Sequence, residues 1–260
     1  MRKVIKCIVM LILILIVCCA CTGQLEKETK TEKATTEATT EAPKPFTKMD
    51  AQKLSAGSVL TEEEIDRIDD VEQFFYASKI DDETFARMKG KSYRKGCVMD
   101  RENLRYVRVL HVDGEGCTRI GEIVCNKALA KDFVEIFTEL YENNYKIEKM
   151  MLVDEYDGDD DASMEDNNTS CFNFRPVPGS NHLSQHAYGR AIDINPLYNP
   201  YVTSRGYMPD NAGDYVDRSK DIPYKIDRED LCYKVFTEHG FVWGGNWNSE
   251  KDYQHFQKKQ

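Results

Sequence analysis

The sequence predicts a domain of the α+β class, with a mainly antiparallel sheet flanked by helices. Segments with helical periodicity alternate irregularly with short β-branched or aromatic segments, without the repeated strand–helix–strand spacing of a parallel sheet. About 200 residues remain once the N-terminal segment is set aside, which is the length of one domain with a sizeable core.

The first half of the domain is predicted to contain two strands and two helices. A capping-box pattern at 61–64 (TEEE) and apolar residues at helical spacing predict a helix over 62–77. The stretches 104–111 (LRYVRVLH) and 121–125 (GEIVC) have the composition of strands. Asn126 can cap the next helix, whose apolar stripe is Leu129, Phe133, Ile136, Phe137, Leu140 and Tyr141.

Further strands are predicted at 147–153 (IEKMMLV) and 190–194 (RAIDI). Between them, the acidic segment 154–170 is expected to be a solvated loop near the mouth of a site. An EF-hand calcium loop is rejected there, because placing Gly158 at the sixth position puts Val153 at the first.

The C-terminal third begins with an expected Pro/Asn/Tyr-rich loop over 195–209. A helix capped by Asp227 and stopped by Gly240 follows. Gly244-Gly245 marks a turn, and the stretch YQHFQ at 253–257 is predicted to be the final strand.

The N-terminal segment differs in composition from the rest. Residues 1–20 combine a basic start with an apolar run of about fourteen residues, which is typical of a signal peptide. Ala20 precedes Cys21 as in bacterial lipoproteins, so Cys21 is the predicted lipidation site; a plain signal peptide or an anchor helix is the alternative. The Thr/Glu/Lys/Pro-rich segment 21–55 is expected to be a flexible tether, and 56–260 the folded domain.

The charge and cysteine content limit the partners and cross-links of this domain. The net charge of the chain is −10, and removal of the signal with its three basic residues makes it more negative by three. An acidic exterior argues against nucleic acid as a partner. The domain contains five cysteines, Cys97, Cys117, Cys125, Cys171 and Cys232, which allow one or two disulfides and leave at least one thiol unpaired.

The stretch SNHLSQHAYGRAIDIN at 180–195 concentrates possible metal ligands. Alternation along the predicted strand places Asp193 on the face opposite Ile192 and Ile194. His186 lies seven residues earlier. A catalytic zinc ion needs three protein ligands and an open position, so a third ligand is expected from elsewhere, and His255 is the candidate.

The other histidines are alternative members of such a ligand set. His182 and His186 have the HxxxH spacing of a helical zinc pair, but Leu183 stands where the HExxH motif requires Glu. His182 is therefore expected to lie at the surface or behind the ligands. His111 in a strand and His239 at a helix end are expected to be structural.

The pattern Ser184-x-His186-x-x-Gly189-x-Ala191-x-Asp193, with Asp252-x-x-His255 further on, resembles the two signatures of zinc D-alanyl-D-alanine carboxypeptidases of the vancomycin-resistance type. The resemblance implies the α+β fold shared with hedgehog domains. It also implies Zn²⁺ held by His186, Asp193 and His255, and a catalytic base at Asp252. Several family members have Glu in place of Asp252, and phage-lysin endopeptidases of the superfamily are similar in using Asp.

The resemblance also suggests roles for residues around the signatures. Arg175 matches the position of an arginine that stabilises the transition state or binds the substrate carboxylate; an ordinary surface arginine paired with the acidic loop is the alternative. Ser184 is expected to bind substrate or support a ligand. Trp243 and Trp247 are each expected either to wall the pocket or to belong to the core.

The leading hypothesis is a lipid-anchored zinc D,D-carboxypeptidase on the extracellular face of the bacterial cytoplasmic membrane. Its expected partner is the peptidoglycan stem peptide, from which it would remove the terminal D-Ala. The alternatives are a peptidoglycan endopeptidase, cleaving L-alanyl-D-glutamate or cross-link bonds, and a non-catalytic wall-binding domain.

Overall fold

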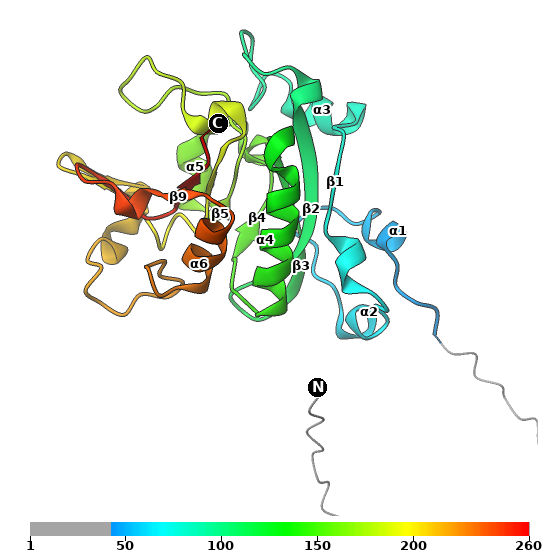
Figure 1. Cartoon of the computed structure of the whole chain (residues 1–260). Helices are drawn as coiled ribbons and strands as arrows, with labels where there is room; N and C mark the ends of the chain where they lie inside the picture. Colours follow the sequence, from blue (N-terminus) through cyan, green and yellow to red (C-terminus); the bar gives the residue numbers. More distant parts are fainter. Residues whose placement is uncertain (1–42, 260) are drawn as a thin grey trace, which may run out of the picture. The chain divides into compact units, whose positions relative to one another are not determined.

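The computed structural model describes residues 43–259 (Figure 1). The predicted signal peptide, Cys21 and the tether up to residue 42 lie outside these residues. Within the described part of the chain, no helix is long and apolar enough to cross a membrane.

The predicted α+β class is confirmed. The helices are α1 (Lys48–Ala51), α2 (Glu62–Asp66), α3 (Asp82–Met88), α4 (Ala130–Glu142), α5 (Asp160–Glu165) and α6 (Leu231–Glu238). Three small sheets are antiparallel: β1 (Tyr76–Ser78), β2 (Leu104–Val112) and β3 (Thr118–Asn126); β6 (Ala191–Asp193), β11 (His255–Gln257) and β9 (Val242–Trp243); and β10 (Lys251–Asp252), β7 (Tyr201–Thr203) and β8 (Gly206–Met208). The short pair β4 (Lys149–Met150) and β5 (Asn168–Thr169) is parallel.

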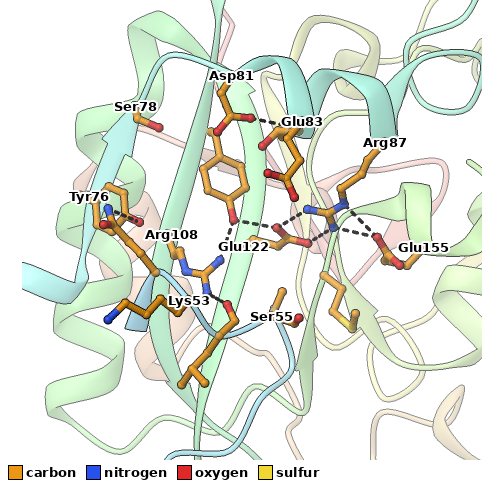
Figure 2. Close-up of a pocket in the computed structure, with 16 residues that line it drawn as sticks. Lys53, Ser55, Tyr76, Ser78, Asp81, Glu83, Arg87, Arg108, Glu122 and Glu155 are labelled. Carbon is orange, nitrogen blue, oxygen red and sulfur yellow. Dashed lines mark hydrogen bonds and ion pairs between the residues drawn. The ribbon is translucent and has the colours of Figure 1, made fainter. Parts of the chain in front are cut away.

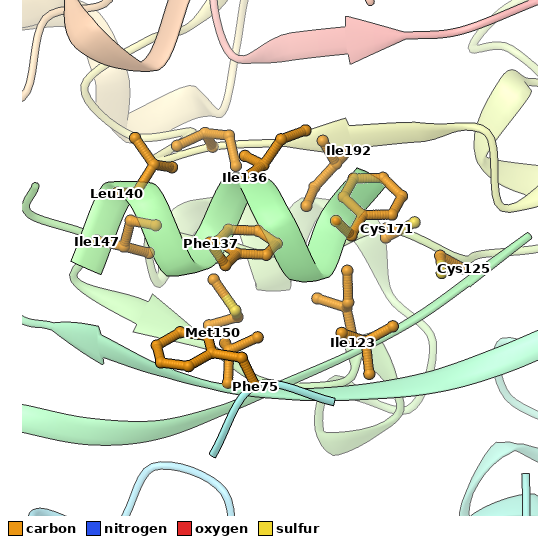
Figure 3. Close-up of a cluster of buried hydrophobic side chains, with 14 of the residues drawn as sticks. Phe75, Ile123, Cys125, Ile136, Phe137, Leu140, Ile147, Met150, Cys171 and Ile192 are labelled. Carbon is orange, nitrogen blue, oxygen red and sulfur yellow. The ribbon is translucent and has the colours of Figure 1, made fainter. Parts of the chain in front are cut away.

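Helix α4 is the centre of the hydrophobic core. Its predicted apolar stripe is confirmed, because Phe133, Ile136, Phe137 and Leu140 are all buried. Asn126 caps the short 3-10 turn that precedes the helix, as predicted. Figure 3 shows Ile192 on one side of α4 and side chains of the β1–β2–β3 side on the other. The helix therefore packs between the long β2–β3 hairpin and strand β6, which carries Asp193.

The predicted helix over 62–77 is wrong beyond residue 66. The capping box at Thr61 and Glu64 starts α2 as expected, but α2 has little more than one turn. The side chain of Asp70 then accepts a hydrogen bond from the Glu72 amide at 3.1 Å and starts a separate 3-10 turn. After that turn the chain forms β1, because its backbone pairs with the edge of β2.

The two expected loops contain more structure than composition suggested. The segment 154–170 holds α5 and β5, and Asp154 is buried with its carboxylate accepting from Ser92 N at 2.9 Å and Ser92 Oγ at 3.0 Å. A solvated loop is therefore the wrong description of this segment. The segment 195–209 contains the β7–β8 hairpin. Conversely, the strand predicted over 147–153 shortens to β4.

The remaining predicted elements are found with shifted ends. Strands 104–111 and 121–125 correspond to β2 and β3, and 190–194 corresponds to β6. Asp230 rather than Asp227 caps α6, accepting from the amide of Cys232 at 2.9 Å. The turn at Gly244-Gly245 is a 3-10 turn, and the final strand is β11.

The five cysteines of the described residues are all free thiols, so the one or two disulfides that their number allowed are not formed. Cys125, Cys171 and Cys232 are buried, and burial raises the pKa of each thiol. Such thiols are poor nucleophiles and act as small core residues.

The segment 43–55 packs on the domain, although its composition had placed it in the tether. Phe46 is buried and stacks on Phe74 with ring centroids 5.9 Å apart. The guanidinium of Arg108 donates to the carbonyls of Ala51, at 3.1 Å, and Leu54. The compact unit accordingly begins at Pro43 rather than at residue 56.

A cavity of about 520 Å³ lies between this segment and α3 (Figure 2). Its floor is a chain of paired charges. Tyr106 Oη accepts from Arg108 Nη1 at 3.0 Å and donates to Glu122 Oε2 at 2.8 Å, and Glu122 also pairs with Arg87. Arg87 pairs in turn with Glu155 at 2.8 Å. These charges satisfy one another and fasten α3 and the N-terminal segment to the hairpin.

We predict that the packed segment 43–55 contributes to stability. A chain that begins at residue 56 loses the Phe46 and Ala51 contacts, and its free energy of unfolding should fall by at least about 3 kcal/mol, which is the scale of losing one buried aromatic residue. A chain that begins at residue 43 is the control, and its free energy of unfolding should equal that of the full-length chain. Urea unfolding of both chains measures the difference, and equal midpoints would contradict the prediction.

Candidate metal centre and active site

The pairing of β6 with β11 brings the two sequence signatures together. Asp193 and His255 are 62 residues apart, yet they are direct partners in the strand register. His255 Nδ1 lies 3.0 Å from Asp193 Oδ1. Both side chains are buried. The predicted convergence of these two residues is thus a direct consequence of the strand register.

His186 joins them from the 3-10 turn that precedes β6. Ser184 caps this turn, with its Oγ accepting from the His186 amide at 3.3 Å. Gly189 closes it with φ of +62°. His186 Nε2 lies 3.2 Å from His255 Nδ1 and 3.2 Å from Asp193 Oδ2. The three side chains therefore meet at one point.

The position of Gly189 explains why this turn requires glycine. A Cβ added there would lie 2.5 Å from the amide nitrogen of Asn126 and 2.9 Å from the carbonyl carbon of Cys125. The Asn126 amide donates to the Gly189 carbonyl at 2.8 Å. Both the left-handed backbone and the close approach to β3 exclude a side chain. Strand β3 thereby supports the turn that holds His186.

The donor set fits zinc. One ligand atom from each of His186, Asp193 and His255 lies within 4.8 Å of the other two, and all three residues are buried. His186 Nδ1 is 2.6 Å from the carbonyl oxygen of Cys171, which accepts the ring proton and leaves the Nε2 lone pair free for a metal. Two imidazole nitrogens and one carboxylate oxygen form a common catalytic zinc set with an open position.

Electrostatics keeps Asp193 ionised. Burial acts to raise its pKa, but the neighbouring imidazoles of His186 and His255 hold the pKa of Asp193 well below its ordinary value. A buried carboxylate of this kind must be paired with a positive charge. A divalent cation between the three groups would supply that charge.

Two other groups of potential ligands occur among the described residues, and neither is buried throughout. Asp113 of the first group already pairs with Arg119 at 2.5 Å. Asp132 of the second pairs with Lys258 at 2.8 Å. Their carboxylates are engaged in structural contacts, so the group around Asp193 is the best candidate for a metal.

Asp252 lines the same cavity as the three potential ligands. Its Oδ1 is buried and has no hydrogen-bond partner. Burial raises the pKa of Asp252 to about 7, an effect that the nearby imidazole of His255 opposes. The backbone of Asp252 packs closely against Gly244. A Cβ added to Gly244 would lie 2.6 Å from the Asp252 carbonyl oxygen, so a larger residue there would collide with it. A carboxyl with such a pKa is suited to proton transfer.

Arg175 also lines the cavity and is largely buried. Its Nη2 lies 2.5 Å from Asp160 Oδ2 of helix α5. The expected pairing with the acidic segment is therefore present, but the pair is inside the cavity rather than on the surface. The Arg175 Nε is buried without a partner, so one donor of the guanidinium remains free for a ligand.

The cavity has a volume of about 470 Å³. Three loops form its walls: the 176–183 turn, the β7–β8 hairpin and the 247–250 turn. Trp247 belongs to the wall, and its ring centroid lies 5.4 Å from that of His255. Trp243 instead belongs to the core, where its Nε1 donates to the Tyr253 carbonyl at 2.8 Å.

The remaining histidines lie outside this cluster. His182 is exposed on the 176–183 turn. His111 is buried with its Nδ1 2.7 Å from the Ile147 carbonyl oxygen, and His239 lies at the end of α6, 3.5 Å from Asp132. Sequence reasoning did not find Asp160 or the Cys171 carbonyl. Asp160 is one of several acids in its run, and a backbone carbonyl leaves no signal in the sequence.

Residues 178–258 match the sequence model of a protein family described as D-alanyl-D-alanine carboxypeptidase. The matched segment contains both signatures and confirms the resemblance on which the site was predicted, while Arg175 precedes it. The match supports the function of a hydrolytic peptidase, from a family that is generally metal-dependent. No curated protein and no solved structure matches the chain.

We predict that Gly189→Ala destabilises the domain more than Gly179→Ala does. Both glycines have positive φ, +62° and +71°, but nothing lies within 4 Å of a Cβ added at Gly179. Gly179→Ala should cost about 1 kcal/mol for backbone strain alone. Gly189→Ala should cost at least about 2 kcal/mol more because of the clash with Asn126. Urea unfolding compares the variants, and equal losses would show that the close approach carries no energetic weight.

Proposed function

Given the family match over residues 178–258, we propose that the protein is a zinc-dependent D,D-carboxypeptidase that removes the terminal D-Ala from peptidoglycan stem peptides. One observation supports this proposal above all others. His186, Asp193 and His255 converge in a buried cluster, and the same cavity is lined by a carboxyl, Asp252, that has a free oxygen.

Bound zinc would act as a Lewis acid that makes water a nucleophile at neutral pH and polarises the scissile carbonyl. Asp252 accepts the proton of the attacking water. As the carbon–nitrogen bond breaks, the same carboxyl returns the proton to the amine of the departing D-Ala. The cluster geometry supports His186 Nε2, Asp193 and His255 Nδ1 as the proposed metal ligands.

Arg175 is proposed to bind negative charge on the substrate. Its ion pair with Asp160 uses Nη2, and Nη1 donates to the Pro176 carbonyl at 3.4 Å, which leaves Nε and the remaining Nη hydrogens as donors. These donors can bind the developing oxyanion or the terminal carboxylate of the peptide. Ser184 supports the site by capping the His186 turn and also lines the cavity.

The proposed location follows from the N-terminal sequence. Lipidation at Cys21 after removal of residues 1–20 would hold the enzyme at the extracellular face of the bacterial cytoplasmic membrane, next to its substrate. Metabolic labelling with a fatty acid, compared between the wild type and Cys21→Ala, tests this placement.

We predict that the chain from residue 22 onward, loaded with zinc, releases D-Ala from a stem pentapeptide ending in D-Ala-D-Ala. Mass spectrometry of the product detects a loss of one alanine. A chelator should abolish the release and added zinc should restore it. Cleavage inside the stem or of cross-links, without release of D-Ala, would instead favour the endopeptidase alternative, and zinc binding without any hydrolysis would favour the binding domain.

We further predict that Asp252→Asn lowers kcat by roughly 10²–10⁴-fold, the usual contribution of a general base. Zinc content should stay at one ion per chain, because Asp252 is not one of the three ligands. Asp217→Asn, which changes an exposed aspartate outside the cavity, is the matched control. Full activity of a zinc-loaded Asp252→Asn variant would refute the assignment of the base.

A further inference from the structure

Gln257 lies beside His255 for a reason set by the strand geometry. The two residues are two positions apart on β11, so their side chains project from the same face. In the strand register, His255 is opposite Asp193 and Gln257 is opposite Ala191. Because Ala191 carries only a methyl group, the Gln257 side chain has room to turn toward the His255 ring.

The contact between them involves the ring nitrogen that does not face the ligand cluster. Gln257 Oε1 lies 3.2 Å from His255 Nε2. The other nitrogen, Nδ1, points toward Asp193 and His186. A nitrogen that binds a metal must present its lone pair, so the ring proton has to be on Nε2. That proton can then be donated to the Gln257 carbonyl oxygen.

The two histidines of the cluster are held in different ways. The far nitrogen of His186 meets the backbone carbonyl of Cys171 at 2.6 Å, and no substitution of that residue removes a carbonyl. The far nitrogen of His255 meets a side chain. The orientation of the His255 ring therefore depends on a side chain, that of Gln257, which a substitution can remove.

The backbone of Gln257 is held independently of its side chain. It pairs with Ala191 on one side and with Val242 on the other. The amide of the next residue, Lys258, donates to the Arg190 carbonyl at 3.0 Å. Replacing the side chain should therefore leave β11 in place.

We infer that Gln257 is a positioning residue that fixes His255 with its proton on Nε2 and its Nδ1 lone pair toward the metal. The inference rests on the proposed function, in that the cluster binds zinc. Partners of this kind usually change metal affinity by 10- to 100-fold.

Three variants test the inference by zinc affinity, measured by competition with a chromogenic chelator. Gln257→Leu keeps the approximate size and removes the acceptor, so zinc should bind 10- to 100-fold more weakly. Gln257→Glu keeps an acceptor and adds charge, so it should bind zinc at least as tightly as the wild type. Gln52→Leu removes a glutamine whose Nε2 is 3.2 Å from Tyr76 Oη, and its zinc affinity should be unchanged.

Further measurements distinguish positioning from other effects. Urea unfolding of the metal-free chains should give equal midpoints for the wild type and Gln257→Leu, and the cobalt-substituted Gln257→Leu variant should have an altered visible spectrum. Wild-type zinc affinity in Gln257→Leu would overturn the inference. An increase in KM with unchanged zinc affinity would also overturn it, and would assign Gln257 to the substrate.

The failure of the inference can be told apart from failure of the proposed function. Release of D-Ala by the wild type is scored separately. If the wild type binds zinc but releases no D-Ala, the proposed reaction is wrong, and the zinc affinities of the variants still decide the role of Gln257. If the wild type binds no zinc, both the metal centre and the role of Gln257 are refuted.

Discussion

The register between β6 and β11 is the constraint on which the site depends. Ile192 pairs with Phe256, and both are fully buried in the main core. Burial of two such side chains is worth roughly 2 kcal/mol each. Because side chains alternate across a strand, fixing this pair toward the core sets Asp193 and His255 on the opposite face. A slip by one residue would place a carboxylate and an imidazole among the aromatic rings.

The charged groups around the cavity are mostly paired with one another. The chain is acidic overall, yet the groups nearest the cluster are individually compensated. Asp193 has two imidazoles, and Arg175 is matched by Asp160. Asp252 has no such ion-pair partner, and its Oδ1 is one of three buried atoms of the cavity lining without a hydrogen bond, together with Arg175 Nε and Gln254 Oε1. Buried polar atoms are normally paired, so an unpaired carboxyl oxygen beside the three proposed ligands supports the role proposed for Asp252.

The sequence was most informative where the signal is local. The composition of the β2 and β3 segments and the apolar stripe of α4 are carried by neighbouring residues, and these elements were predicted correctly. The spacing of His186, Gly189 and Asp193 was equally local. Long-range pairing was not predictable in the same way. Residues 76 and 77 were expected to end the helix over 62–77 but belong to β1, because the edge of β2 offers backbone hydrogen bonds.

The residues of the candidate site show the same contrast between local sequence signals and long-range contacts. The second signature made His255 a candidate, but only the strand register shows why it meets Asp193, with its Nδ1 3.0 Å from the carboxylate. Asp160 could not be singled out among the acids of its run, since its importance comes from contact with Arg175. The packing of Phe46 was hidden by the polar residues around it, because one aromatic residue hardly changes the composition of a segment.

The five free thiols have a consequence for how the domain matures. Cross-link formation and reshuffling take seconds to hours and need an oxidant. The part of the chain between residues 43 and 259 has no such step to wait for, since its three buried cysteines fill space in the core. A mild reductant in the surroundings would leave the finished domain intact.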